Sequence, residues 1–231
     1  RKLNEVQKEE WTKVKGRFQE LVFVEPIEQL LYLASTQIDA GRTMQNDDSV
    51  IDSLASLAKK TGFVSQNFSE ATAQALAPLE PFAAYVITQA IQRYGQNERS
   101  LFSFLNARGR NSLSEYEGKI YQLQCCYDYI YYNFYSYLKE ANADSMQWSS
   151  MQVAIERVEG QLWDTKTDLV DAVKLVKAIG LLNLFGNASF KMSREDTALY
   201  AKTALNIENP TGLLKKLEQF KIIRYASYKF R

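Results

Sequence analysis

Apolar residues recur at helical spacing along most of this chain. From Ile27 to about Asp39, for example, apolar positions three or four residues apart fall on one face of a helix. The same pattern predicts helices over 3–15, 27–39, 48–61, 71–77, 81–94, 98–106, 119–139, 151–158, 168–184, 194–205 and 211–220. The chain has only ten Gly and four Pro, too few turn residues for a typical all-β fold. We therefore expect a mainly helical protein.

Two short regions have strand-like composition instead. Residues 18–24 form a β-rich run that Pro26 closes, which predicts one isolated core strand. A single strand needs partners that the rest of the chain does not supply. The chain also begins with Arg1 instead of Met, so we expect it to be a piece of a longer protein. At the other end, 222–225 and 228–231 read as two strands around a tight turn.

The last part of the chain has a recognisable order of elements. Three predicted helices, 168–184, 194–205 and 211–220, are followed by a terminal hairpin, which is the order of a winged helix-turn-helix. We therefore expect a helical lid-type bundle over 27–160, with the isolated strand before it, and a winged-helix domain over 161–231.

Charge is distributed unevenly between these parts. The net charge of the whole chain is +1, so it gives no general attraction to nucleic acid or membranes. Residues 191–231 nevertheless carry nine basic and four acidic side chains, a net charge of +5. We expect a basic patch there that could contact DNA. Its candidate residues are Lys215, Lys216, Lys221, Arg224 and Lys229. The alternative is that this module docks onto a protein.

An aromatic segment lies in the middle of the chain. Eight of the fourteen Tyr residues fall between Tyr116 and Tyr137. Residues 120, 123, 127, 130, 134 and 138 share one face of a single long predicted helix. Aromatic platforms for nucleic acid carry interleaved cations, whereas here only Lys119 and Lys139 flank the run. We therefore favour core packing over base stacking, and a partner surface remains the alternative.

Several kinds of chemistry have no residues to support them. The chain has no His, which excludes His-based catalytic triads and His-ligated metals. Its two Cys are neighbours, so we predict no metal site and a reduced, cytoplasmic setting. Neither the phosphate-binding loop Gly-x-x-x-x-Gly-Lys-Ser/Thr nor Gly-x-Gly-x-x-Gly is present. The longest apolar stretch, 179–185, is too short to cross a bilayer, so we expect no membrane contact.

Two arginines have contexts that suit phosphate binding. Arg17 lies between a predicted helix end and the predicted strand, and Arg99 lies at the start of the helix over 98–106. A cation at a helix N-terminus opposes the helix dipole unless an acid or a phosphate compensates it. Spacing alone favours a structural role for both arginines.

Four stretches resemble large bacterial P-loop ATPases of the AAA-like superfamily, which we associate with mobile-element and phage-defence gene clusters. They are 10–26 (EWTKVKGRFQELVFVEP), 97–105 (NERSLFSFL), 177–186 (KAIGLLNLFG) and 214–231 (LKKLEQFKIIRYASYKFR). They span nearly the whole chain in the order found in that family. The resemblance implies that 1–26 is the C-terminal edge of an ATPase core, and that a lid and a winged helix follow.

The pattern also resembles, more remotely, origin-recognition-type AAA+ proteins, in which an arginine precedes the last core strand, a helical lid follows and a winged helix closes the chain. This second resemblance implies roles for the two arginines. Arg17 would be an arginine-finger-like residue acting in a neighbouring subunit of a homo-oligomer, and Arg99 a sensor-like residue that contacts the nucleotide phosphate. A guanidinium there would stabilise charge on the transferring phosphoryl group. ATP and Mg²⁺ would be bound by a core that precedes Arg1, so this chain alone should not hydrolyse ATP. The alternative function is a non-enzymatic helical scaffold with a DNA-binding or protein-docking module.

Overall fold

The computed structural model describes residues 26–38, 48–95, 101–106, 111–140 and 142–231. The described chain is mainly helical, as predicted, and contains one small two-stranded sheet. Its helices are α2 (Ile27–Ser35), α3 (Asp48–Lys60), α4 (Glu70–Ala75), α5 (Pro81–Tyr94), α6 (Leu101–Asn106), η1 (Leu113–Glu115), α7 (Leu123–Asn133), α8 (Tyr135–Lys139), α9 (Ser145–Glu159), α10 (Lys166–Phe185), α11 (Arg194–Thr203) and α12 (Pro210–Gln219). The strands β1 (Tyr225–Ala226) and β2 (Lys229–Phe230) form the hairpin.

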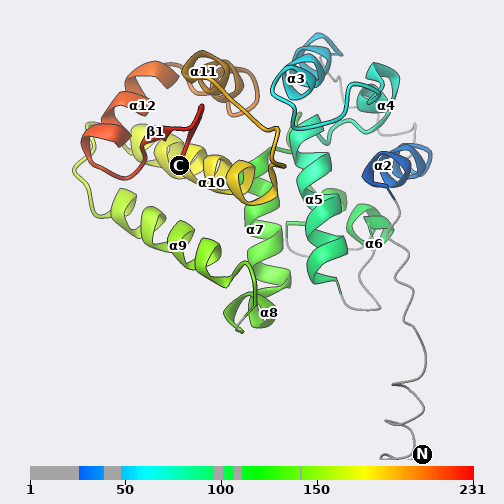
Figure 1. Ribbon diagram of the computed structural model, residues 1–231, viewed down its shortest axis with the longest axis horizontal. Helices are drawn as coiled ribbons and strands as arrows, with labels where there is room; N and C mark the ends of the chain where they lie inside the picture. Colours follow the sequence, from blue (N-terminus) through cyan, green and yellow to red (C-terminus); the bar gives the residue numbers. More distant parts are fainter. Residues whose placement is uncertain (1–25, 39–47, 96–100, 107–110, 141) are drawn as a thin grey trace, which may run out of the picture.

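Helix α10 is the central element of the fold. It packs against α9, α7, α5 and α12, and Figure 1 shows α9 running alongside it while α11, α12 and the hairpin lie on its other side. Its buried residues include Leu175, Ile179 and Leu182. The apolar core is continuous from α2 to the hairpin. Helix α10 therefore joins the predicted bundle to the C-terminal elements, and the predicted boundary at residue 161 stays a prediction.

The prediction of one continuous helix over 119–139 is wrong in two respects. The helix begins only at Leu123, because Tyr121 is held in extended backbone: its N–H donates to the carbonyl of Pro78, and it forms a bridge with Leu79. It is also interrupted at Phe134, whose φ of −114° and ψ of 16° end α7 and precede α8. Phe134 is buried against Tyr94, so the interruption brings an aromatic ring into the core.

Most of the aromatic segment lies in the core, as predicted. Leu123, Tyr127, Ile130, Phe134 and Leu138 are all buried, whereas position 120 is half-buried. The helix predicted over 151–158 is longer than expected, since α9 begins at Ser145 and contributes a buried Trp148.

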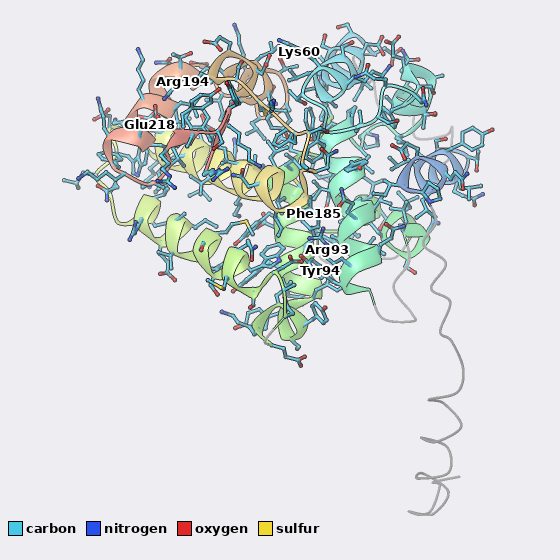
Figure 2. The ribbon with its side chains drawn as sticks, in the orientation of Figure 1. Lys60, Arg93, Tyr94, Phe185, Arg194 and Glu218 are labelled. Atoms are coloured by element: carbon cyan, nitrogen blue, oxygen red, sulfur yellow. The ribbon has the colours of Figure 1, made fainter. Side chains whose placement is uncertain are left out.

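Aromatic and charged side chains join α5, α9 and α10 at one junction. The Tyr94 hydroxyl donates to Asp144 at 2.8 Å and accepts from the indole of Trp148 at 3.1 Å. Arg93 pairs with the same carboxylate at 3.0 Å and lies 4.9 Å from the centre of the Phe185 ring. Figure 2 shows Arg93, Tyr94 and Phe185 together at this point. The junction fixes the ends of three helices against one another.

The isolated strand predicted over 18–24 and the helix over 3–15 lie outside the described residues. Among the helices in the described ranges, none combines the length and the apolar character that crossing a bilayer requires. Cys126 is buried and Cys125 is half-buried, and neither forms a disulfide. Burial raises the pKa of both thiols.

Candidate nucleic-acid interface

Helix α12 presents one apolar and one polar face. The side chain of Asn209 caps its N-terminus by accepting the N–H of Gly212 at 3.0 Å, and Pro210 occupies the first turn. Leu213, Leu214 and Leu217 are buried. The opposite face exposes Thr211, Lys215 and Gln219, which follow one another at intervals of four residues. Polar side chains of these types can all hydrogen-bond phosphates or base edges.

The hairpin follows α12 and is held in place by backbone hydrogen bonds. Tyr225 pairs with Phe230 and Ala226 with Lys229, while Arg224 and Arg231 exchange two backbone hydrogen bonds of 2.8 Å. The turn residues Ser227 and Tyr228 both have positive φ, 52° and 62°, as the tightest hairpin turns require.

Side chains and backbone also attach the hairpin to the helices beneath it. The amide nitrogen of Asn183 on α10 donates to the carbonyl of Phe230 at 2.8 Å. The N–H of Met192, just before α11, donates to the carbonyl of Tyr228 at 2.9 Å. The hairpin is therefore fixed relative to α10 and α11, which helps it to keep a defined position beside α12.

Arg194 connects α11, α12 and the hairpin. Its guanidinium binds both carboxylate oxygens of Glu218 on α12, at 2.5 and 2.8 Å, and lies 4.6 Å from the Tyr225 ring and 5.1 Å from the Phe230 ring. Figure 2 shows Arg194 and Glu218 facing one another across α11 and α12. The hydrogen bond from Arg194 lowers the pKa of Glu218. The one carboxylate of α12 is thus neutralised, so it does not oppose an approaching phosphate.

The structure divides the five basic candidates into two groups. Lys215, Lys221 and Arg224 are exposed on α12 and in the segment that leads to the hairpin. Lys216 is half-buried, with its ammonium 2.5 Å from Asp164 and 5.5 Å from the Trp163 ring. Lys229 is also half-buried and lies 5.4 Å from the Phe190 ring. Burial and the nearby charge of Arg231 lower the pKa of Lys229. The first three cations are therefore the ones available to a large polyanion.

The other predicted site residues cannot be placed. Arg17 and Arg99 lie outside the described residues, and α6 begins two positions after Arg99. Among the described residues, no three Cys, Asp or Glu side chains gather in a way that could hold a metal ion.

A buried carboxyl at the joint between the bundle and α11 was not predicted from the sequence. Glu80 is fully buried, where it caps α5 by accepting the N–H groups of Phe82 and Ala83. The Tyr200 hydroxyl on α11 donates to it at 2.9 Å. Burial raises the pKa of Glu80 to about 8, against the effect of these three donors. An acid directly before Pro81 was a capping signal in the sequence, but nothing there indicated its partner Tyr200.

A second contact, a partly buried ion pair, joins the bundle to α11. The Lys60 ammonium on α3 binds Asp196 on α11 at 2.6 Å. Burial opposes ionisation of Asp196, but hydrogen bonds from Lys60 and Ser193 keep its pKa below the usual value. The C-terminal elements are thus attached to the bundle by one buried and one partly buried contact.

Comparison of the chain with protein families, with curated proteins and with solved structures found no match.

Proposed function

We propose that residues 161–231 form a winged helix-turn-helix that binds duplex DNA, with α12 as the recognition helix and the hairpin as the wing. The observation that carries this proposal is the outward face of α12 and its continuation toward the hairpin. Lys215, Lys221 and Arg224 are exposed there, while the acid on the same helix is already paired with Arg194. The order of α10, α11, α12 and hairpin supports the same interpretation.

The dimensions of α12 suit a major groove. An α-helix with its side chains is about 10–12 Å in diameter, which matches the width of about 12 Å of the major groove of B-DNA. Thr211, Lys215 and Gln219 would face the bases or the nearest phosphates, and Lys221 and Arg224 would contact the flanking backbone. Phosphate contacts of this kind dominate affinity and make it fall with salt.

The burial of Leu213, Leu214 and Leu217 bears on the protein-docking alternative. A typical protein-docking surface has exposed apolar residues at its centre. The leucines of α12 are instead buried in the core of this chain. The exposed face of this helix carries polar and cationic groups instead. It therefore suits a polyanion better than an apolar protein surface.

DNA binding is tested by fluorescence anisotropy of a labelled duplex titrated with the whole chain at low and moderate salt. We expect saturable binding that weakens as salt rises. Lys215→Ala should weaken it severalfold, because one phosphate contact is lost. Lys139→Ala is the matched control, since Lys139 is an exposed lysine on α8. Absence of binding at low salt, or equal losses in both variants, would contradict the proposal.

We further propose that the chain is the C-terminal part of an AAA-like ATPase, in which the nucleotide state is passed through the helical lid to the winged helix. Support for this comes from the four ordered sequence stretches that resemble such enzymes. ATP and Mg²⁺ would be held by a preceding core, Arg99 would contact the phosphates, and Arg17 would complete a neighbouring subunit's site. The lid helices would then transmit the change through α10, which contacts both α5 and α12.

The ATPase proposal is tested in the full-length protein. Arg17→Ala and Arg99→Ala should each lower ATP turnover while the far-ultraviolet circular dichroism spectrum is unchanged. Mixing the two variants should restore part of the turnover if Arg17 acts across a subunit boundary. Normal turnover in both single variants would reject the assignment and leave the scaffold alternative.

A further inference from the structure

A cavity of about 680 Å³ lies between α9, α10 and the segment that carries the hairpin. Its walls are largely apolar, and their apolar residues include Met146, Met151, Ile179, Leu184, Ile222 and Ile223. Pockets that bind small organic molecules have volumes of about 300–1,000 Å³ and walls of this character. The cavity is therefore of a suitable size for a small ligand, and too small for a folded partner.

Two cations are among the residues that line this cavity. Lys229, on β2, and Arg231, which follows β2 and exchanges backbone hydrogen bonds with Arg224, both line it. None of the described lining residues is acidic. Their charges repel one another, and the lowered pKa of the half-buried Lys229 reflects both its burial and the charge of Arg231. A bound anion would relieve that repulsion.

The arrangement calls for a ligand with two different ends. A small anion without an apolar chain would leave the walls of α9 and α10 in water. An apolar molecule without charge would bring no anion to the two cations. An amphiphile satisfies both parts of the cavity at once.

We propose that this cavity binds a single-chain fatty acid, with its carboxylate between Lys229 and Arg231 and its alkyl chain between α9 and α10. Lys215, Lys221 and Arg224 do not line the cavity. The site therefore uses other side chains than the three exposed cations proposed to bind DNA, and its proposal does not rest on either function proposed above.

Nuclear magnetic resonance of the whole chain labelled with ¹³C at the Met methyl groups gives a local readout. The chain has four Met residues, and Met146 and Met151 line the cavity. Titration with dodecanoate below its micelle concentration should shift the Met146 and Met151 signals saturably. Dodecanol, which lacks the carboxylate, should bind at least tenfold more weakly. No saturable shift of these two signals, or equal affinity for dodecanol, would overturn the proposal.

Three variants separate the two ends of the site. Lys229→Gln combined with Arg231→Gln should weaken dodecanoate binding about tenfold or more, because charge-assisted hydrogen bonds are lost. Ser150→Trp should abolish binding by filling the cavity from an exposed position on α9. Lys119→Gln combined with Lys139→Gln is the charge-matched control, since both lysines are exposed and neither lines the cavity, and it should bind dodecanoate like the parent chain. Unchanged affinity in the double variant or in Ser150→Trp, with the fold intact by circular dichroism, would reject the site.

Discussion

The contact between Tyr200 and Glu80 provides a sharp test of how the C-terminal elements are attached to the helical bundle. Replacing Tyr200 by Phe removes only the hydroxyl that donates to Glu80, because the ring remains packed edge-on against Phe82 at 5.1 Å. Tyr200 and Glu80 are both fully buried, so water cannot replace the lost hydroxyl donor. Loss of a buried hydrogen bond costs about 0.5–1.5 kcal/mol when the acceptor is neutral and about 1.5–3 kcal/mol when it is charged.

The charge of Glu80 gives this prediction a pH dependence with a definite sign. Its pKa is raised from 4.5 to about 8 by burial. The folded state therefore holds a proton that the unfolded state has released between those two values, and stability should fall as pH rises from about 4.5 to 8. Because each pKa unit corresponds to about 1.4 kcal/mol, the total fall is of order 3–5 kcal/mol.

Urea unfolding followed by Trp fluorescence at pH 5, 7 and 9 measures both effects. Tyr200→Phe should cost about 1 kcal/mol at pH 5 and about 2 kcal/mol at pH 9, where the carboxylate needs its donor most. Glu80→Gln should remove most of the pH dependence of the free energy of unfolding, both in the parent chain and in the Tyr200→Phe variant. Tyr32→Phe is the control, since Tyr32 is 61% exposed, and it should change stability little. A cost for Tyr200→Phe that is below about 0.5 kcal/mol at pH 9, or smaller at pH 9 than at pH 5, would refute this reasoning.

Three further sets of variants test the packing around α10 and α12 by urea unfolding or hydrogen exchange. A methyl group at Gly180 would lie 2.3 Å from the sulfur of Met151. Gly180→Ala should therefore destabilise the fold by about 1–2 kcal/mol, although Ala is ordinarily the better helix former. A stabilising effect would contradict the close contact. In a Met151→Ala background the same change should be neutral or stabilising. Asn209→Ala should cost about 1 kcal/mol through loss of the α12 cap, whereas Asn209→Asp should not; equal effects would exclude capping. Arg194→Ala should speed hydrogen exchange in 224–231 more than Glu218→Gln does, because only the first change removes the contacts with the rings of Tyr225 and Phe230. Equal exchange rates in the two variants would show that those contacts are unimportant.

Strong local signals explain why most helices could be predicted from the sequence. The ends of α5 follow from Pro81 and Gly95, and α11 begins where Ser193 caps the N–H of Asp196. The hairpin could be predicted from its β-rich residues around a short polar turn. In each case the information lies within a few residues of the element.

Long-range contacts explain the errors. The periodicity of 119–139 continues through Tyr121 and Phe134, but one is drawn into pairing with Leu79 and the other is buried against Tyr94. A helical pattern cannot reveal a partner forty residues earlier in the chain. The predicted strand over 18–24 lies outside the described residues and stays a prediction.

The basic candidates show the same limit. The net charge of 191–231 indicated a cationic surface, but composition treats all its lysines alike. The structure pairs Lys216 with Asp164 and places the half-buried Lys229 over the Phe190 ring, so three of the five candidates, Lys215, Lys221 and Arg224, are exposed. Arg17 and Arg99 lie outside the described residues, and their proposed roles rest on the resemblance alone.

The central claim is that the outward face of α12 and the segment leading to the hairpin bind DNA through three cations. The most direct test compares the salt dependence of duplex binding for the parent chain and for the triple variant Lys215→Ala, Lys221→Ala and Arg224→Ala. Each phosphate contact contributes about 0.9 to the slope of log affinity against log salt. The account predicts a slope reduced by about 2–3 in the triple variant, with the fold unchanged. A parent chain that does not bind the duplex, or a triple variant with the parent's slope and affinity, would contradict it.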